Sequence, residues 1–248
     1  MAKEERAPLR NTIILIVGLF LFWQLAYLAV GDVALRSPWQ TMRFLGTLMQ
    51  TDVFWLHLAD TLKAFAVALA IAIALGLLIG FALGLHRLSG DAMEPMLVAL
   101  YSIPKITLYP IILLAFGVGI SAKIAFGAIH GIIPVALFTL SAIRTIKPIL
   151  IKTGRVLKLN PTVMVRAILF PAAVPEIFTG IRVGFSLTLI GTVLGEMFAA
   201  QRGLGYLLMN AISLYNSDLI MAVTFLLVVL AASVNALLLA VDRRLHHG

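Results

Sequence analysis

Two kinds of charged residue in this 248-residue chain have surroundings in which they could do chemistry. The first kind is isolated within long apolar runs, as Lys105 and Glu196 are. A charged side chain inside a membrane-spanning segment is costly, and it commonly marks a pathway for an ion or a substrate. The second kind is gathered in the stretch 144–171, which holds six lysine and arginine residues and no acidic residue.

Lys105 and Glu196 each allow two interpretations. Lys105 lies between Pro104 and Pro110, and such prolines interrupt a helix in the way seen where backbone lines a cavity. Its side chain either faces such a cavity or extends to water at the membrane surface. Glu196 either faces a pore or is a packing group held by hydrogen bonds near the outer interface.

Other chemistry is excluded or disfavoured. The chain has no cysteine and no G-x-x-x-x-G-K-[ST] phosphate-binding motif, so any ATP hydrolysis must occur in another chain. Its five histidines are scattered, and we predict that His130 is a hydrogen-bonded packing residue rather than a ligand. We therefore predict no catalytic residue, no metal site and no enzyme activity for this chain.

The composition is that of a polytopic membrane protein. Of the residues, 61% are hydrophobic and 12% are charged, whereas a soluble domain is about half apolar and about a quarter charged. The net charge of +8 could suggest a nucleic-acid partner. We predict none, because cytoplasmic loops of membrane proteins carry excess lysine and arginine. The predicted fold is all-α, with the lipid bilayer around a single transmembrane domain over 1–248.

Six apolar segments are predicted to span the membrane: 12–30, 64–85, 92–118, 124–143, 177–200 and 219–241. The first is interpreted as a retained span, because its apolar run is longer than that of a signal peptide. Residues 31–62 are predicted to form an external segment with a surface helix that contains Phe54, Trp55 and Leu58. Small residues four apart predict close helix packing in the second and fifth spans, at Gly76, Gly80, Gly84, Gly191 and Gly195.

Six spans place both termini on one side, and the basic residues indicate which side. Twelve lysines and arginines fall with the termini and five fall opposite, with Lys105 and Arg182 left out as intramembrane or borderline. We therefore predict cytoplasmic termini and a cytoplasmic stretch 144–171. The twelve are Lys3, Arg6, Arg10, Arg87, Arg144, Lys147, Lys152, Arg155, Lys158, Arg166, Arg243 and Arg244, and the five are Arg36, Arg43, Lys63, Lys123 and Arg202.

Apolar residues recur at helical spacing within the stretch 144–171, which is too charged to span a bilayer. This pattern predicts short amphipathic helices at the membrane surface. Such a basic, helical loop is where a membrane protein would engage a cytoplasmic partner.

The second half of the chain resembles the permease subunits of bacterial ABC importers, within the nitrate, sulfonate, taurine and bicarbonate branch. The similarity lies in the order of several segments: Pro104 onward, the basic loop, 170–175, 180–184, Glu196 and 203–206. The family signature is E-A-A-x-x-x-G, followed after nine residues by I-x-L-P. With its proline placed on Pro171, Ile168 and Phe170 fall at the isoleucine and leucine, but Lys152, Thr153 and Gly154 fall at E-A-A and Lys158 at the glycine.

The resemblance implies a type I ABC importer permease fold in the bacterial inner membrane. It implies a second permease copy, two ATPase subunits that bind ATP and magnesium, an external solute-binding protein, and no cofactor in this chain. A coupling helix is expected at about Val156–Val165, within the cytoplasmic coupling loop 144–171. The residues expected to couple to the ATPase are Lys152, Thr153, Gly154, Leu157, Lys158, Leu159, Asn160, Pro161 and Pro171.

The resemblance also suggests a solute pathway, which we predict to include Ser102, Lys105, Thr107, Tyr109 and Glu196. A cationic Lys105 would favour a small anion such as a sulfonate, taurine, nitrate or bicarbonate. Relatives that carry neutral solutes, such as pyrimidine precursors of thiamine, leave a neutral substrate open. The sequence also leaves open an ion-coupled secondary transporter and a structural scaffold, whereas a membrane-embedded enzyme would need clustered acidic or histidine residues that the five scattered histidines do not supply. The secondary transporter would need paired intramembrane carboxylates.

Overall fold

The computed structural model describes residues 6–32 and 35–247, and every regular element in that part of the chain is a helix. Residues 1–5, with Lys3, lie outside the described residues. The chain divides into two compact units, 1–56 with 207–229, and 57–206 with 230–248.

The first unit contains α1 (Arg6–Val30), α2 (Pro38–Leu48) and the first part of α11 (Ser217–His247). Helix α2 begins with a capping box, in which the side chains of Ser37 and Gln40 each accept a hydrogen bond from the other residue's backbone N–H. The Trp23 ring of α1 packs against Phe225 of α11, with 5.7 Å between ring centroids. Aromatic packing and a well-capped helix thus stabilise this unit.

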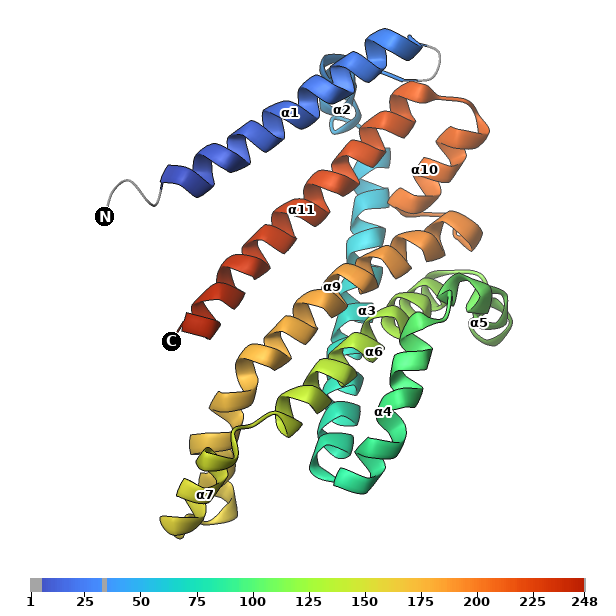
Figure 1. Ribbon diagram of the computed structural model, residues 1–248. Helices are drawn as coiled ribbons and strands as arrows, with labels where there is room; N and C mark the ends of the chain where they lie inside the picture. The colour runs from blue at the N-terminus through green and yellow to red at the C-terminus, as the bar shows by residue number, and fades with distance from the viewer. Residues whose placement is uncertain (1–5, 33–34, 248) are drawn as a thin grey trace. The chain divides into compact units, whose positions relative to one another are not determined.

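The second unit is built around α6 (Ile120–Arg144), which packs along α9 (Phe170–Ala199) over most of its length (Figure 1). Helix α3 (Asp52–Leu85) lies against α6 as well. The three predicted packing glycines of α3 each face one residue of α6, one turn apart: Gly76 and Val135, Gly80 and Thr139, Gly84 and Ile143. Because the residue numbers of α3 and α6 rise together along these three contacts, the two helices run parallel.

Glycine also allows the close approach of α6 to α9. A Cβ atom on Gly191 would lie 2.8 Å from the His130 ring, and one on Gly195 would lie 3.1 Å from Lys123 Cα. Along this contact the residue numbers of α9 rise as those of α6 fall, so α6 and α9 are antiparallel. The five glycines predicted to pack between helices therefore all lie at close helix contacts.

The helix that begins at Asp52 shows that the prediction for residues 31–62 was partly wrong. Phe54, Trp55 and Leu58 belong to the 34-residue helix α3, not to a separate surface helix. No proline or glycine interrupts the chain between Asp52 and Gly76, so the backbone has no reason to leave the helix there. Trp55 Nε1 donates to the Met49 carbonyl and steadies the start of α3.

The predicted span 92–118 is a bent pair of helices. Helix α4 (Arg87–Ser102) is followed by the 3₁₀ turn η1 (Lys105–Leu108) and by α5 (Tyr109–Phe116), with an 88° bend between the two parts. The bend lies at Ile103, whose extended conformation (ψ 134°) is the one that a following proline favours. Pro110 causes no second break, because it occupies a first-turn position of α5 where a missing N–H is harmless.

Within residues 6–32 and 35–247, five helical stretches are long and apolar enough to cross a membrane, or six if the bent pair counts as one span. They are Arg10–Val30, Asp52–Leu85, Ile120–Arg144, Thr162–Phe198 and Ser217–Arg243. The fifth predicted span, 177–200, starts earlier than expected, because α9 begins at Phe170 and continues through Pro175.

Candidate functional site: a basic hairpin and a buried ionic cluster

The stretch 148–169, here called the basic hairpin, is a pair of short helical segments that precede α9 (Figure 1). It contains α7 (Pro148–Val156), α8 (Pro161–Met164) and the π-helical turn η2 (Val165–Leu169). The predicted coupling helix Val156–Val165 is wrong as a single element, because α7 ends where it was expected to begin and a turn separates α7 from α8.

Two residues explain the turn. Lys158 has a backbone φ of +50°, which places it in the left-handed conformation and ends the helical course of α7. Asn160 then caps α8, since its Oδ1 accepts a hydrogen bond from Val163 N at 2.8 Å. Proline at the first position of α8 fits the same start signal.

Gly154 holds the two arms of the basic hairpin together. It is buried, and a Cβ atom there would meet the Met164 side chain and come within 3.1 Å of Ile168 Cδ1. Only glycine lets α7 approach α8 and η2 this closely.

The charges of the basic hairpin lie on its surface. Lys147, which precedes α7, and Lys152, Arg155, Lys158 and Arg166 are exposed. Among the described residues no salt bridge involves any of these five cations. Apolar side chains are exposed beside them, with 81% of Val156 and 62% of Leu157 accessible to solvent.

Arg144 was grouped with these cations in the sequence but behaves differently. Its guanidinium contacts Glu94 at 2.8 Å and Asp91 at 3.0 Å, and donates to the Arg87 carbonyl at 3.0 Å. Arg144 therefore joins the end of α6 to the start of α4.

The predicted coupling residues fall in three places. Lys152, Thr153 and Gly154 lie in α7, and Pro171 lies in the first turn of α9. The turn between the arms and the start of α8 hold the others: Leu157, Lys158, Leu159, Asn160 and Pro161.

The predicted pathway residues are not brought together. Ser102 and Thr107 are exposed and flank the break after α4. Lys105 is half-buried, and its Nζ donates to the Tyr101 carbonyl at 3.0 Å. These three residues remain close in sequence at the bend.

Tyr109 and Glu196 are buried inside the fold, away from the exposed residues at the bend. The Tyr109 side chain packs against Phe126, and its hydroxyl donates to the Gly195 carbonyl at 2.6 Å. Glu196 has no exposed surface and accepts a hydrogen bond from Thr61 Oγ1 at 2.8 Å. The second interpretation of Glu196, a packing group held by hydrogen bonds, describes what is observed.

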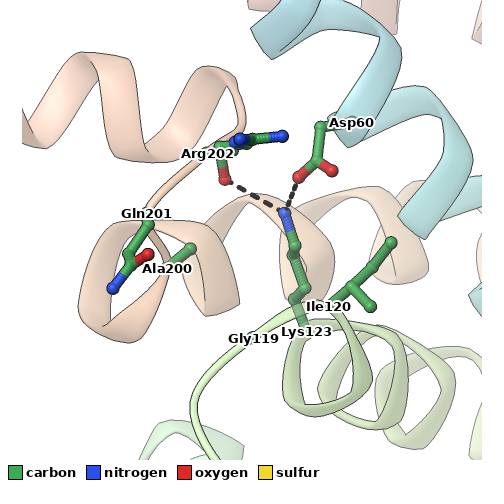
Figure 2. A pocket seen from close by; sticks show the side chains of 7 residues that line it. All are labelled: Asp60, Gly119, Ile120, Lys123, Ala200, Gln201 and Arg202. Atoms are coloured by element: carbon green, nitrogen blue, oxygen red, sulfur yellow. Dashed lines mark hydrogen bonds and ion pairs between the residues drawn. The ribbon is translucent and has the colours of Figure 1, made fainter.

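Glu196 is part of a set of charges, here called the ionic cluster, formed by the buried Lys123 and Glu196 and the partly exposed Asp60. Lys123 is 2% exposed and its Nζ contacts Asp60 and lies 3.4 Å from Glu196. The same Nζ donates to the Arg202 carbonyl at 3.0 Å, as Figure 2 shows. The three residues come from α3, α6 and α9, so one ammonium group joins three helices.

The loop after α9 is fastened to this cluster. Glu196 accepts a hydrogen bond from Gly205 N at 3.0 Å, and Thr61 Oγ1 accepts one from Leu204 N at 2.7 Å. Gly203 has a φ of +117° and donates its N–H to His57 Nδ1. A side chain at Gly203 would collide with the Glu196 carboxylate, so glycine is required for the contact.

A cavity of about 220 Å³ opens beside the ionic cluster (Figure 2). Its lining comes from α3, the start of α6 and the loop after α9: Asp60, Gly119, Ile120, Lys123, Ala200, Gln201 and Arg202.

The sequence interpretation missed Asp60 and Lys123 as partners of Glu196. One signal was present, because His57, Asp60 and Thr61 recur at i, i+3 and i+4 and so share one face of an otherwise apolar helix. His130 was interpreted correctly as a packing residue: it is buried and its Nδ1 hydrogen-bonds with the Phe126 carbonyl at 2.8 Å.

Comparison with known proteins identifies the family. The model of a family described as "Binding-protein-dependent transport system inner membrane component" matches residues 72–247. The chain belongs to this family. Its members are membrane subunits of ABC transport systems rather than catalytic enzymes, and they work with an ATPase and a solute-binding protein.

Curated relatives cover almost the whole permease. The taurine transport system permease protein TauC of Escherichia coli is 27% identical over 97% of this chain and 91% of its own length. The riboflavin transport system permease protein RibX of Chloroflexus aurantiacus is 32% identical, over 89% and 85%. The putative aliphatic sulfonates transport permease protein SsuC of E. coli is 30% identical, over 90% and 86%.

Solved structures confirm the type I importer permease fold. A chain of the MetNI methionine ABC transporter, in a structure titled as inward facing, superposes with a TM-score of 0.66 over 77% of this chain and 96% of that chain, at 20% identity. An amino acid ABC transporter crystallised with histidines gives 0.64, over 81% and 98%, also at 20% identity.

The family signature gives the Lys158 conformation a meaning. The signature has glycine where this permease has Lys158, and a left-handed backbone is one that glycine adopts without steric penalty. The turn geometry that the signature glycine would allow is thus present here, but a lysine occupies it.

Proposed function

We propose that this permease carries a small anionic solute, such as a sulfonate, that a binding protein delivers and ATP hydrolysis drives inward. The taurine and sulfonate systems among its relatives support this substrate class. Lys105, half-buried at the break between α4 and α5, supplies a cation where the helix is interrupted. Half-buried cations at broken helices suit anion recognition.

The observation that carries the coupling part of the proposal is the basic hairpin. It presents exposed apolar side chains, and cations that have no salt bridge in the described part of the chain, at the start of the 37-residue helical stretch Thr162–Phe198. We expect the basic hairpin and both termini to be cytoplasmic, and two permease copies to dock on two ATPase subunits that bind ATP and Mg²⁺. The positive-inside distribution of lysine and arginine supports that orientation.

Reconstitution tests the proposal. The permease, its ATPase and its binding protein would be placed in liposomes, and uptake of a radiolabelled sulfonate would be followed with and without ATP. Uptake should require all three proteins and ATP. Sulfonate uptake by the permease alone under an ion gradient would contradict it.

Lys105→Met tests the role of the cation. We expect sulfonate uptake to fall at least about tenfold, because a desolvated charge pair of this kind contributes more than about 1.4 kcal/mol. Lys63→Met, at an exposed position of α3, is the matched control and should transport normally. Unchanged uptake in Lys105→Met would remove Lys105 from the pathway.

A neutral heterocyclic solute is the second candidate, and the 32% identity to the riboflavin permease favours it. The same liposomes, supplied with riboflavin and a riboflavin-binding protein in place of the sulfonate and its binding protein, distinguish the neutral from the anionic substrate. Lys105→Met should leave uptake of a neutral solute unchanged.

A further inference from the structure

The basic hairpin carries charge of only one sign. The stretch 144–171 has six lysine and arginine residues and no aspartate or glutamate. Arg144 is neutralised by Asp91 and Glu94, which leaves five exposed cations without a salt bridge in the described part of the chain. A concentration of unbalanced charge raises the electrostatic free energy of the free protein, and an oppositely charged partner relieves it.

The charge at position 152 is opposite to the charge that the family signature has there. Lys152 stands where the signature has glutamate, and Lys158 stands where it has glycine. The left-handed backbone at Lys158 makes its side chain part of the exposed turn rather than of either helix. Two cations are therefore added on the face that, under the proposed function, meets the ATPase.

Apolar surface accompanies the charge. Ile149, Val156 and Leu157 are each more than half exposed, at 63%, 81% and 62%. Burying such side chains contributes about 25 cal/mol per Å² of apolar surface. A fitting partner would thus combine an apolar groove with acidic side chains around its rim.

We propose that the ATPase partner of this permease presents an apolar groove rimmed by carboxylates, which pair with Lys152, Arg155 and Lys158. The inference rests on the proposed function and adds the charge of the partner surface. Its consequence is that assembly of permease and ATPase depends on electrostatic attraction and weakens as salt screens it.

An anionic lipid surface is the rival occupant, since basic segments beside a membrane attract acidic headgroups. Length favours the ATPase. Helix α9, which follows the basic hairpin, has 30 residues and so is about 45 Å long, whereas the hydrocarbon core of a bilayer is about 30 Å thick. The basic hairpin precedes that helix, where it can project beyond the hydrocarbon core.

The test uses the full-length permease in nanodiscs of neutral phosphatidylcholine, and the ABC ATPase that copurifies with the tagged permease. Binding is measured by biolayer interferometry from 50 to 500 mM NaCl. The wild-type dissociation constant should rise at least about tenfold over this range, because the pairs lie at a rim that salt reaches. Lys152→Glu and Lys158→Glu should each weaken binding at 50 mM NaCl at least about fivefold.

Three controls separate docking from folding and from lipid binding. Lys63→Glu reverses an exposed charge outside the basic hairpin and should bind like wild type. Lys158→Arg keeps the charge and should also bind like wild type. Thermal unfolding of each variant in detergent shows whether a loss of binding reflects a loss of folded protein.

A charge swap identifies the partner residues. A photo-crosslinking residue at Val156 marks the groove, and a carboxylate found next to it is changed to lysine. This ATPase variant should bind Lys158→Glu better than it binds wild-type permease.

Binding that is insensitive to salt and to both charge reversals would overturn the inference, as would a crosslinked groove without carboxylates. If ATP-driven uptake persists in that case, the proposed function still stands. A fluorophore at Val156 that shifts in phosphatidylglycerol nanodiscs without ATPase, and does not shift further when ATPase is added, would overturn the inference in favour of the lipid surface. If the three proteins show no ATP-driven uptake of any tested solute, the proposed function itself fails.

Discussion

The ionic cluster and the basic hairpin handle charge in opposite ways, although one helix, α9, connects them. In the cluster, Lys123 is buried and contacts two carboxylates and a carbonyl. In the hairpin and at Lys147 just before it, five cations are exposed and none has a salt bridge in the described part of the chain. Burial makes an unpaired charge expensive, so the cluster requires its own partners, whereas the hairpin can leave partners to be supplied from outside.

This difference between the two regions decides what a substitution in each will change. A change in the ionic cluster should alter the stability of the permease itself. A change in the basic hairpin should alter assembly and leave the isolated permease folded. The largest effect on the free energy of unfolding should therefore come from the cluster, and the smallest from exposed cations near the hairpin.

Lys123→Met should destabilise the permease by about 3–5 kcal/mol, because Asp60 and Glu196 would be left facing each other without a cation. Thermal unfolding in detergent, or the yield of monodisperse protein, measures the loss. Lys63→Met, on the exposed face of α3, is the control and should unfold like wild type. If both variants unfold at the wild-type midpoint, the ionic cluster does not stabilise the fold.

Gly203→Ala should destabilise by about 1–3 kcal/mol, since its φ of +117° is strained for any side chain and the new methyl group meets the Glu196 carboxylate. The same unfolding assay measures it. Gly46→Ala, inside α2 with no atom within 4 Å of the new Cβ, should instead be neutral or stabilising. Equal shifts in the two variants would mean that the contact of Gly203 with Glu196 is not tight.

Lys158→Gly should stabilise the isolated permease by about 1 kcal/mol, because the left-handed conformation no longer carries a Cβ penalty. Lys152→Gly, in the helical interior of α7, should destabilise the isolated permease by a similar amount. Opposite signs for the same substitution six residues apart would be visible as midpoints on either side of wild type. If both variants were less stable than wild type, the turn would not hold Lys158 in the left-handed conformation.

Arg144→Met should destabilise by about 1 kcal/mol or less, as expected for a partly exposed arginine between two carboxylates. Lys147→Met, three residues later and without a salt bridge in the described part of the chain, should have no measurable effect. These two variants test whether Arg144 stabilises the fold while Lys147 does not. A larger loss of stability in Lys147→Met than in Arg144→Met would show that Lys147 also stabilises the fold.

Composition and spacing were enough to predict the fold class. Apolar segments of bilayer length indicated the spans, and glycines four apart indicated the faces on which α3 and α9 approach α6. Boundaries were less predictable. Helix α3 continues toward its N-terminus past Lys63 and Asp60, because a charged residue lowers hydropathy without ending a helix.

The candidate sites were harder to predict, for a physical reason. Contacts of Asp60, Lys123 and Glu196 join residues far apart in the sequence, and local spacing cannot show which helices meet. The coupling helix was misplaced because apolar periodicity continues through the turn at Lys158, while a single left-handed residue interrupts the backbone. Each arm begins at a proline, Pro148 for α7 and Pro161 for α8, which is a start signal that the sequence interpretation did not use.

The π-helical turn η2, the last part of the basic hairpin, continues into α9 without a gap in the helical backbone. A π turn holds one residue more than the α-helical turn that it replaces. Deleting one residue from Val165–Leu169 would therefore let an α-helical turn replace the π turn with little net rotation around the α9 axis. Such a deletion would keep every lysine of the hairpin and its approximate direction, and so would test the importance of the π turn itself apart from that of the charges.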